Sequence, residues 1–167
     1  MLKAILSAVM MVALLSIGSR HISLANSLDL SQFQWKNRLL FLFAPNRDHP
    51  FFDVLNKSLT THQAEVADRD LVIFERLESG PSSMNTNSLD PQTAQSLRDK
   101  FDIARSEFTV ILIGKDGGIK LKRHDKILLQ DVFDLIDAMP MRQNEVRQRK
   151  QSGGADTAAP NKSGDVE

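Results

Sequence analysis

The tripeptide Arg47-Asp48-His49 has residue types that can do chemistry, and it lies where α/β sheets commonly bind ligands. It follows an apolar run that ends at Ala44-Pro45, and Pro50 then opens a stretch with helical spacing. Ligands bind at the carboxyl ends of such strands, and free amides at a helix start favour anions. His49 has a side chain of the type that could act as a general acid or base. We take Arg47, Asp48 and His49 as a candidate ligand loop for an anion or carbonyl group, with a solvated helix cap as the alternative.

A second set of candidates is basic. It consists of Lys115, Lys120, Lys122 and Arg123, followed by His124. These residues would form a positive strip able to contact an acidic partner or a polysaccharide. The alternative is that the lysines protect an edge strand from pairing with another chain.

Other patterns with catalytic potential have simpler explanations. Asp134 and Asp137 are spaced i,i+3 on a helix and could pair as carboxylates, but helical surface charge is the commoner explanation. The segment 114–118 lacks the glycine spacing of a phosphate loop and fits a hairpin turn. No nucleophile elbow or dinucleotide fingerprint occurs. We therefore assign no catalytic residue.

The sequence contains no cysteine. Disulfides, thiolate nucleophiles, dithiol exchange and cysteine-ligated zinc are therefore excluded, so the chain cannot be a thiol oxidoreductase or a thiol peroxidase. His49, His62 and His124 lack the spacing of metal ligands. We predict no metal site and no cofactor.

The first 25 residues are typical of a cleavable signal peptide. Lys3 precedes an apolar stretch over residues 4–17, and Ser23-Leu24-Ala25 supplies the small residues of a cleavage site. The alternative, an uncleaved anchor, would need about 20 apolar residues. We expect cleavage after Ala25, no stable membrane span afterwards, and a periplasmic or secreted bacterial protein.

The charge of the chain restricts its partners. Lysine and arginine together equal aspartate and glutamate, and removing Lys3 and Arg20 with the leader leaves a small acidic excess. A general nucleic-acid binder needs a basic surplus, so the charge argues against nucleic acid as a partner. The expected partner is a protein or an anionic ligand of the cell envelope.

Positioning the candidate loop and strip requires alternating strands and helices. The apolar patterns predict strands at 38–45, 71–74, 108–113 and 119–122, and helices at 50–67, 91–101 and 128–139. Residues 78–89 are predicted to be an exposed loop, residues 141–150 could begin another helix, and Phe33 and Trp35 are expected to pack on the sheet. The order βαβ-α-ββα, with a central mixed sheet, is that of a thioredoxin-like three-layer α/β/α sandwich. Predicted boundaries are a signal peptide at 1–25, one domain at 26–147 and a disordered tail at 148–167.

Several stretches also resemble a known family, the P-DUDES, or domain of unknown function 4174. The matching stretches lie at 35–45, at 68–71, at 108–121 and, most specifically, at 133–142, where the sequence reads Phe-Asp-Leu-Ile-Asp-Ala-Met-Pro-Met-Arg. The resemblance covers about residues 28–147. It implies a peroxiredoxin-like thioredoxin fold in exported bacterial proteins, with relatives among vertebrate sushi-repeat and coiled-coil-named matrix proteins, and no established catalytic residues.

The sequence departs from redox-active relatives at two places. The loop 45–50 has no cysteine where a thioredoxin or peroxiredoxin carries its thiol, and no proline precedes Thr109, where such proteins place a cis-proline. We therefore expect a non-redox binding or interaction module. The alternative is a cysteine-independent enzyme that uses the Arg47-Asp48-His49 loop.

Overall fold

The fold is organised around one fully buried strand, β1 (Arg38–Ala44). The computed structural model describes residues 28–155. On one side β1 pairs in parallel with β2 (Leu71–Leu77), and on the other it pairs antiparallel with β5 (Thr109–Ile113). Strands with covers on both faces are apolar at consecutive positions, which explains the unbroken hydrophobic run. The prediction of a central strand is confirmed.

Shorter elements complete a six-stranded mixed sheet in the order β4-β3-β2-β1-β5-β6. The remaining strands are β3 (Ser82–Met84), β4 (Asn87–Leu89) and β6 (Ile119–Arg123); the helices are η1 (Leu30–Phe33), α1 (Pro50–Thr61), α2 (Gln63–Asp68), α3 (Pro91–Lys100), α4 (Leu129–Asp137) and α5 (Pro140–Ala155). β6 is an edge strand joined to β5 by a tight turn in which Gly117 has φ 81°. Both features follow the prediction.

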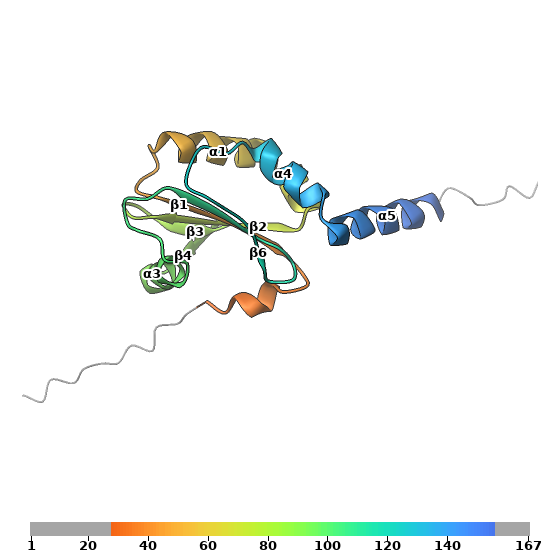
Figure 1. Ribbon diagram of the computed structural model, residues 1–167, viewed down its shortest axis with the longest axis horizontal. Helices are drawn as coiled ribbons and strands as arrows, with labels where there is room; N and C mark the ends of the chain where they lie inside the picture. Colours follow the sequence, from red (N-terminus) through yellow and green to blue (C-terminus); the bar gives the residue numbers. More distant parts are fainter. Residues whose placement is uncertain (1–27, 156–167) are drawn as a thin grey trace, which may run out of the picture.

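Helices cover both faces of the sheet (Figure 1). On one face, α1 and α4 bury a cluster that includes Leu40, Leu42, Phe52 and Ile136. On the other face, α3 closes a second cluster built on Phe41, Phe43, Phe74 and Phe101, with η1 at its margin. Successive residues of β1 point to opposite faces and so supply both clusters. The predicted thioredoxin-like three-layer sandwich is confirmed.

Two regions differ in detail from the prediction. The helix expected over 50–67 is interrupted at His62, where the backbone leaves helical geometry, giving α1 and α2. The segment predicted as an exposed loop, 78–89, contains the β3–β4 hairpin. Asn85 adopts φ 52° at its turn, and its side chain accepts a hydrogen bond from the Ile73 amide at 2.9 Å. The strands contain mainly Ser and Asn, which is why no apolar alternation revealed them.

The C-terminal helix changes the predicted tail. α4 ends at Asp137, before Pro140, and Pro140 occupies the first turn of α5, as its missing amide permits. α5 continues to Ala155, so the expected disordered tail does not begin at residue 148. The predicted leader and the rest of the tail lie outside the described residues. None of the helices within residues 28–155 is long and apolar enough to cross a membrane.

The two aromatic residues before β1 have different environments. Phe33 packs edge-on against Phe74 with ring centroids 5.9 Å apart, as expected. Trp35 is 64% exposed, so the expectation that it packs on the sheet is wrong. Its backbone has φ 64° and its amide donates to the Lys115 carbonyl at 2.6 Å, which turns the side chain outward.

Candidate functional site

The loop between β1 and α1 holds His49 between aromatic rings. The imidazole stacks on Phe108 at 5.0 Å between centroids and 4° between planes, and it meets Phe51 edge-on at 5.4 Å. His49 occupies the N-cap position of α1, but its side chain makes no capping bond. Its Nδ1 is buried and has no hydrogen-bond partner among the described residues. The ring is therefore fixed by packing.

The three residues of the predicted ligand loop do not converge. Arg47 reaches Glu75 of β2 at 3.2 Å, with half of its side chain exposed. Asp48 is exposed to solvent. Since Arg47, Asp48 and His49 point to a carboxylate, to water and to an aromatic pair respectively, the structure does not bring their functional groups to one point.

The predicted basic strip is internally paired. Lys120 contacts Asp116 at 2.6 Å, Lys122 donates to the Phe101 carbonyl at 3.1 Å, and Arg123 makes two 2.8 Å bonds to Asp125. Lys115 turns away and is nearly buried between Asp70 at 2.8 Å and Glu145 at 2.9 Å. The four residues therefore belong to two regions of the surface. Strand β6, which carries the other three, lies at the sheet edge.

A cluster that the sequence interpretation missed lies at the carboxyl end of β1 and β2, on the α3 face. Arg98 of α3 is 1% exposed and lies over the Phe43 ring at 5.6 Å. Arg76 of β2 and Arg105 approach the same carboxylate, Glu78, as Arg98 does. Burial, and then the neighbouring Arg76, lower the pKa of Arg98, and burial also lowers the pKa of Arg76. This carboxylate is surrounded by more positive charge than it neutralises.

One sequence signal could have revealed Arg98. Ala94, Leu97 and Phe101 give the helix predicted at 91–101 its apolar face, and Arg98, four residues after Ala94, falls on the same face. A cation at a core-facing helical position is rare unless it is paired. The position of Arg98 on this face is therefore visible in the sequence and indicates a buried, functional or paired cation.

The opposite end of the sheet contains a second charged network, which docks α5. It contains five cations and four carboxylates: Arg38, Arg69, Lys115, Arg142 and Arg149 with Asp68, Asp70, Asp137 and Glu145. Arg38 is 1% exposed and binds both oxygens of Glu145 at 3.2 Å. Asp137 accepts from Arg69 and Arg142, whereas Asp134 accepts from Gln130, so the two helical aspartates do not pair with each other.

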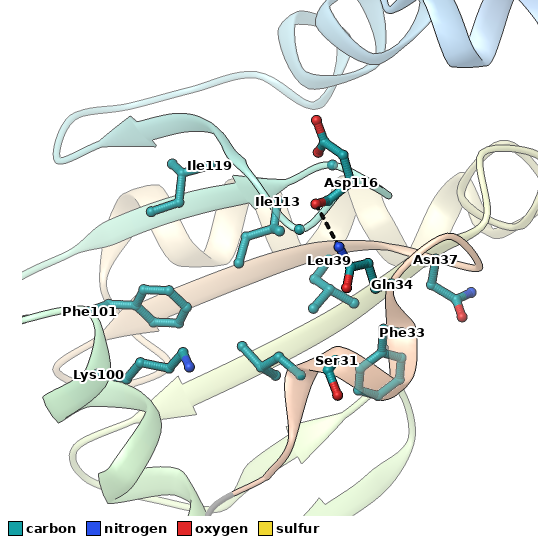
Figure 2. Close-up of a pocket in the computed structure, with 13 residues that line it drawn as sticks. Ser31, Phe33, Gln34, Asn37, Leu39, Lys100, Phe101, Ile113, Asp116 and Ile119 are labelled. Atoms are coloured by element: carbon teal, nitrogen blue, oxygen red, sulfur yellow. Dashed lines mark hydrogen bonds between the residues drawn. The ribbon is translucent and has the colours of Figure 1, made fainter.

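A cavity of about 400 Å³ lies between η1, the β5–β6 turn and the end of α3 (Figure 2). Leu39, Phe101 and Ile113 supply its apolar wall, and Gln34 crosses one side to donate to the Asp116 carbonyl at 3.0 Å. Among the described residues, no group of three or more His, Asp or Glu side chains could hold a metal ion.

Comparison with known proteins gives a family match and a fold match. A family model described as "Domain of unknown function (DUF4174)" matches residues 29–145. The reduced 2-Cys peroxiredoxin of Plasmodium vivax superposes with a TM-score of 0.51 at 14% identity, covering 69% of this chain and 84% of that one. At this identity the similarity shows the fold alone.

Two curated relatives are much longer than the matched region. Coiled-coil domain-containing protein 80 of Danio rerio is 23% identical over 133 residues, which are 70% of this chain and 15% of that protein. Sushi repeat-containing protein SRPX2 of Xenopus laevis is 25% identical over 122 residues, which are 71% of this chain and 27% of that protein. The chain thus spans about a quarter or less of the length of these relatives.

Proposed function

The chain belongs to the DUF4174 family, and from this premise we propose that it is a binding or interaction module that works without thiol chemistry. It has the thioredoxin-like fold of the peroxiredoxins, and its sequence has no cysteine. A thiolate is the nucleophile of disulfide exchange and of thiol peroxidases, so the scaffold has lost that chemistry. Fold alone assigns no other reaction.

The observation that carries this proposal is the ring stack between His49 and Phe108. In redox relatives, a thiol lies in the loop after the first core strand. It faces a cis-proline that precedes the strand corresponding to the one that begins here at Thr109. In this chain the same two loops are joined by His49 and Phe108, with planes 4° apart. Aromatic stacking stabilises the loop by about 0.5–1.5 kcal/mol beyond burial. A region that serves chemistry in redox relatives here serves packing.

We place this module in the bacterial cell envelope, as a periplasmic or secreted protein. The expected leader over residues 1–25 supports this placement. Its partner would be a protein or an anionic ligand. Lys120, Lys122 and Arg123 are the contact expected for an acidic partner, with the edge position of β6 supporting accessibility.

Two redox assays test the absence of thiol chemistry. Dithiothreitol-dependent insulin reduction and peroxide consumption should both equal the protein-free rate. Turnover in either assay would contradict the proposal.

Crosslinking in envelope fractions should capture a partner on the folded chain and not on heat-unfolded chain. A bait with Lys120→Glu and Lys122→Glu should lose an acidic partner, and unchanged capture would remove the strip from the interface.

The alternative, a cysteine-independent enzyme, is favoured by one observation: the buried Nδ1 of His49 has no hydrogen-bond partner among residues 28–155. Such a nitrogen could face a substrate. A substrate screen with His49→Ala tests this alternative, and His62→Ala is the matched control because His62 is exposed at the junction of α1 and α2. Turnover lost in His49→Ala alone, with the fold intact, would replace the module proposal by the enzyme.

A further inference from the structure

The guanidinium of Arg98 leaves one complete edge of its donors unused. Its Nη1 donates to the Ala104 carbonyl at 2.6 Å. Its Nε and Nη2 are buried and have no hydrogen-bond partner among the residues that the structure describes. These two nitrogens carry parallel N–H groups along one side of the planar group, the fork that binds two oxygens of a carboxylate, phosphate or sulfate. A side chain 1% exposed would not leave both donors unpaired without cost.

The positive charges around Arg98 also outnumber the carboxylates that contact them. Glu78 lies 3.3 Å from Arg105, 3.9 Å from the Nε of Arg98 and 4.0 Å from Arg76. Of these three distances, the one to Arg105 is within hydrogen-bond range. Three guanidinium groups thus lie around one carboxylate, and two of them, Arg98 and Arg76, are largely removed from solvent. Glu107, whose charge also acts on Arg98, is itself bonded to the Ala104 amide and to His124. Arg76 makes longer contacts to Ser82 and Gln95, which are neutral.

Movement of Glu78 alone would not resolve this excess. Its Oε2 is buried without a hydrogen-bond partner in the described part of the chain, so a small rotation towards Arg98 is sterically reasonable. That rotation would satisfy one edge of Arg98 and weaken the bond to Arg105. A single carboxylate neutralises one of three cations wherever it points. A second anion on the unused edge of Arg98 would satisfy those donors and leave the bond between Glu78 and Arg105 intact.

The cluster has a buried inner side and an exposed outer side. Arg98 and the ring of Phe43 form the inner side. The side chain of Arg105 is 74% exposed and that of Glu78 is 27% exposed, so they lie between the cluster and solvent. A small anion arriving from solvent would meet Arg105 first and could then reach the unused edge of Arg98.

We infer that Arg98, Arg76 and Arg105 form a binding site for a small oxyanion at the carboxyl end of β1 and β2. The ligand group is a phosphate, a sulfate or a carboxylate, because each presents two oxygens at the spacing of the guanidinium fork. Arg98 binds it through Nε and Nη2, Arg76 contributes charge from β2, and Arg105 closes the outer side. The site lies across the sheet from the His49–Phe108 stack. It goes beyond the proposed function and does not depend on it.

The direct test is titration of the full chain, purified after expression from its complete gene, with inorganic sulfate, inorganic phosphate and acetate. Sodium chloride keeps the ionic strength constant, so that general screening does not change. Calorimetry and the midpoint of thermal unfolding report binding, since a ligand specific for the folded state raises that midpoint. Saturable binding of at least one anion is expected. The two tetrahedral anions and planar acetate separate a phosphate or sulfate site from a carboxylate site.

Three variants test the assigned residues. Arg105→Gln should weaken binding about tenfold, because a charge-assisted hydrogen bond is lost at the outer side. Arg98→Lys keeps the charge, removes the fork and should weaken binding by a similar or larger factor. Glu78→Gln removes the competing carboxylate and should tighten binding several-fold. Arg147→Gln is the matched control, because it removes an exposed arginine of α5 that bonds to Asn144, outside the cluster. The affinity of this variant should equal that of the unmodified chain.

The outcomes separate a ligand site from an internal network. No saturable binding of any of the three anions would overturn the inference. Equal weakening by Arg105→Gln and Arg147→Gln would also overturn it, because binding would then follow net charge. If Arg98→Lys fails to fold, Glu78→Gln still decides: tighter binding supports the site, whereas unchanged or weaker binding contradicts it. The redox and capture assays leave this result unaffected.

Discussion

The two ends of the central sheet each contain a buried arginine, and the two arginines differ in how completely their donors are paired. At the amino end of β1, Arg38 has both oxygens of Glu145 within 3.2 Å and leaves its Nε without a partner. At the carboxyl end, Arg98 is equally buried, yet no carboxylate lies within hydrogen-bond distance in the described structure, and two of its three nitrogens are unpaired. The first arginine is used for structure. The second buries two donors without partners, an arrangement that costs stability.

This difference follows from how the helix at each end is attached to the sheet. α5 has almost no apolar face, and its residue Val146 is the nearest to a hydrophobic anchor, so the helix needs ion pairs to dock. α3 is already held by Leu97, Phe101 and Ala94 in the core. Because packing fixes α3 without help from Arg98, the charge there is free to serve a ligand. Buried ionic groups add little net stability unless fully paired.

The largest expected effect is at the paired end. Glu145→Ala would leave Arg38 and Lys115 buried and without their shared carboxylate, so we expect the free energy of unfolding to fall by about 3–5 kcal/mol. Urea unfolding measures this, and amide exchange shows whether α5 opens first. Asp53→Ala is the control: it breaks an exposed pair with Lys57 and should cost no more than about 0.5 kcal/mol. Equal effects of the two substitutions would contradict a structural role for Glu145.

Replacing each of the two buried arginines by methionine tests whether they differ in their contribution to stability. Arg98→Met removes a charge whose nearest carboxylate, Glu78, lies 3.9 Å away, and it should leave stability unchanged or raise it by about 1–2 kcal/mol, because methionine packs well against Phe43. Arg38→Met should lower stability by roughly 2–3 kcal/mol, because it removes two charge-assisted bonds. The exposed Ala104 carbonyl freed by Arg98→Met can bind water. Thermal unfolding of both variants gives the sign, and a large loss in Arg98→Met would make the two ends alike.

The sequence predicted the sheet and its covering helices better than it predicted the charges. Apolar runs and turn residues were sufficient for β1, β5, the Gly117 turn and α3, whose N-cap residue Asp90 accepts from the Thr93 amide at 2.9 Å. These features depend on local patterns. The β3–β4 hairpin depends instead on Asn85 bonding to a distant strand, and Ser and Asn give no periodic signal.

The candidate site was harder to predict because charge pairing is non-local. The interpretation of Lys115 as part of a surface strip assumed that neighbours in sequence share a surface, whereas its partners Asp70 and Glu145 come from two other elements. Arg98 and Glu78 are likewise 20 residues apart and join only in the folded chain. The proposed loop Arg47-Asp48-His49 was located correctly at a strand end, but side-chain directions decide whether such residues converge. Those directions depend on the Phe108 ring, which the loop sequence does not contain.

Acid should weaken the paired end. Burial alone would raise the pKa of Glu145, but hydrogen bonds from Lys115 and Arg38 outweigh it and lower the pKa; Asp68 is lowered in the same way by Arg142 and Arg149. The folded state therefore binds fewer protons than the unfolded state. Its stabilisation is complete above the unfolded pKa of about 4 and is lost as pH falls through the lowered value. The free energy of unfolding should decline below about pH 5.

Glu145→Gln tests the origin of this decline. Glutamine cannot be deprotonated, so the variant should be less stable at neutral pH and its stability should change less between pH 5 and 2. Unfolding curves at several pH values for both chains measure the slopes. Parallel slopes would assign the acid sensitivity to other carboxylates and remove Glu145 from the explanation.

The smallest expected effects are the stability losses caused by substituting Lys115, which lies in the paired network at the amino end of β1, and Lys120, which lies on the edge strand. Lys115 is 10% exposed and bonded to two carboxylates, so Lys115→Gln should cost about 1–3 kcal/mol by leaving Asp70 and Glu145 with less positive charge. Lys120 forms one surface pair with Asp116, and Lys120→Gln should cost at most about 0.5 kcal/mol. Urea unfolding at two salt concentrations separates them further, because salt screens the surface pair more than the buried one. If both substitutions cost the same and respond equally to salt, Lys115 belongs with the edge strand, and the paired end of the sheet is smaller than the network described above.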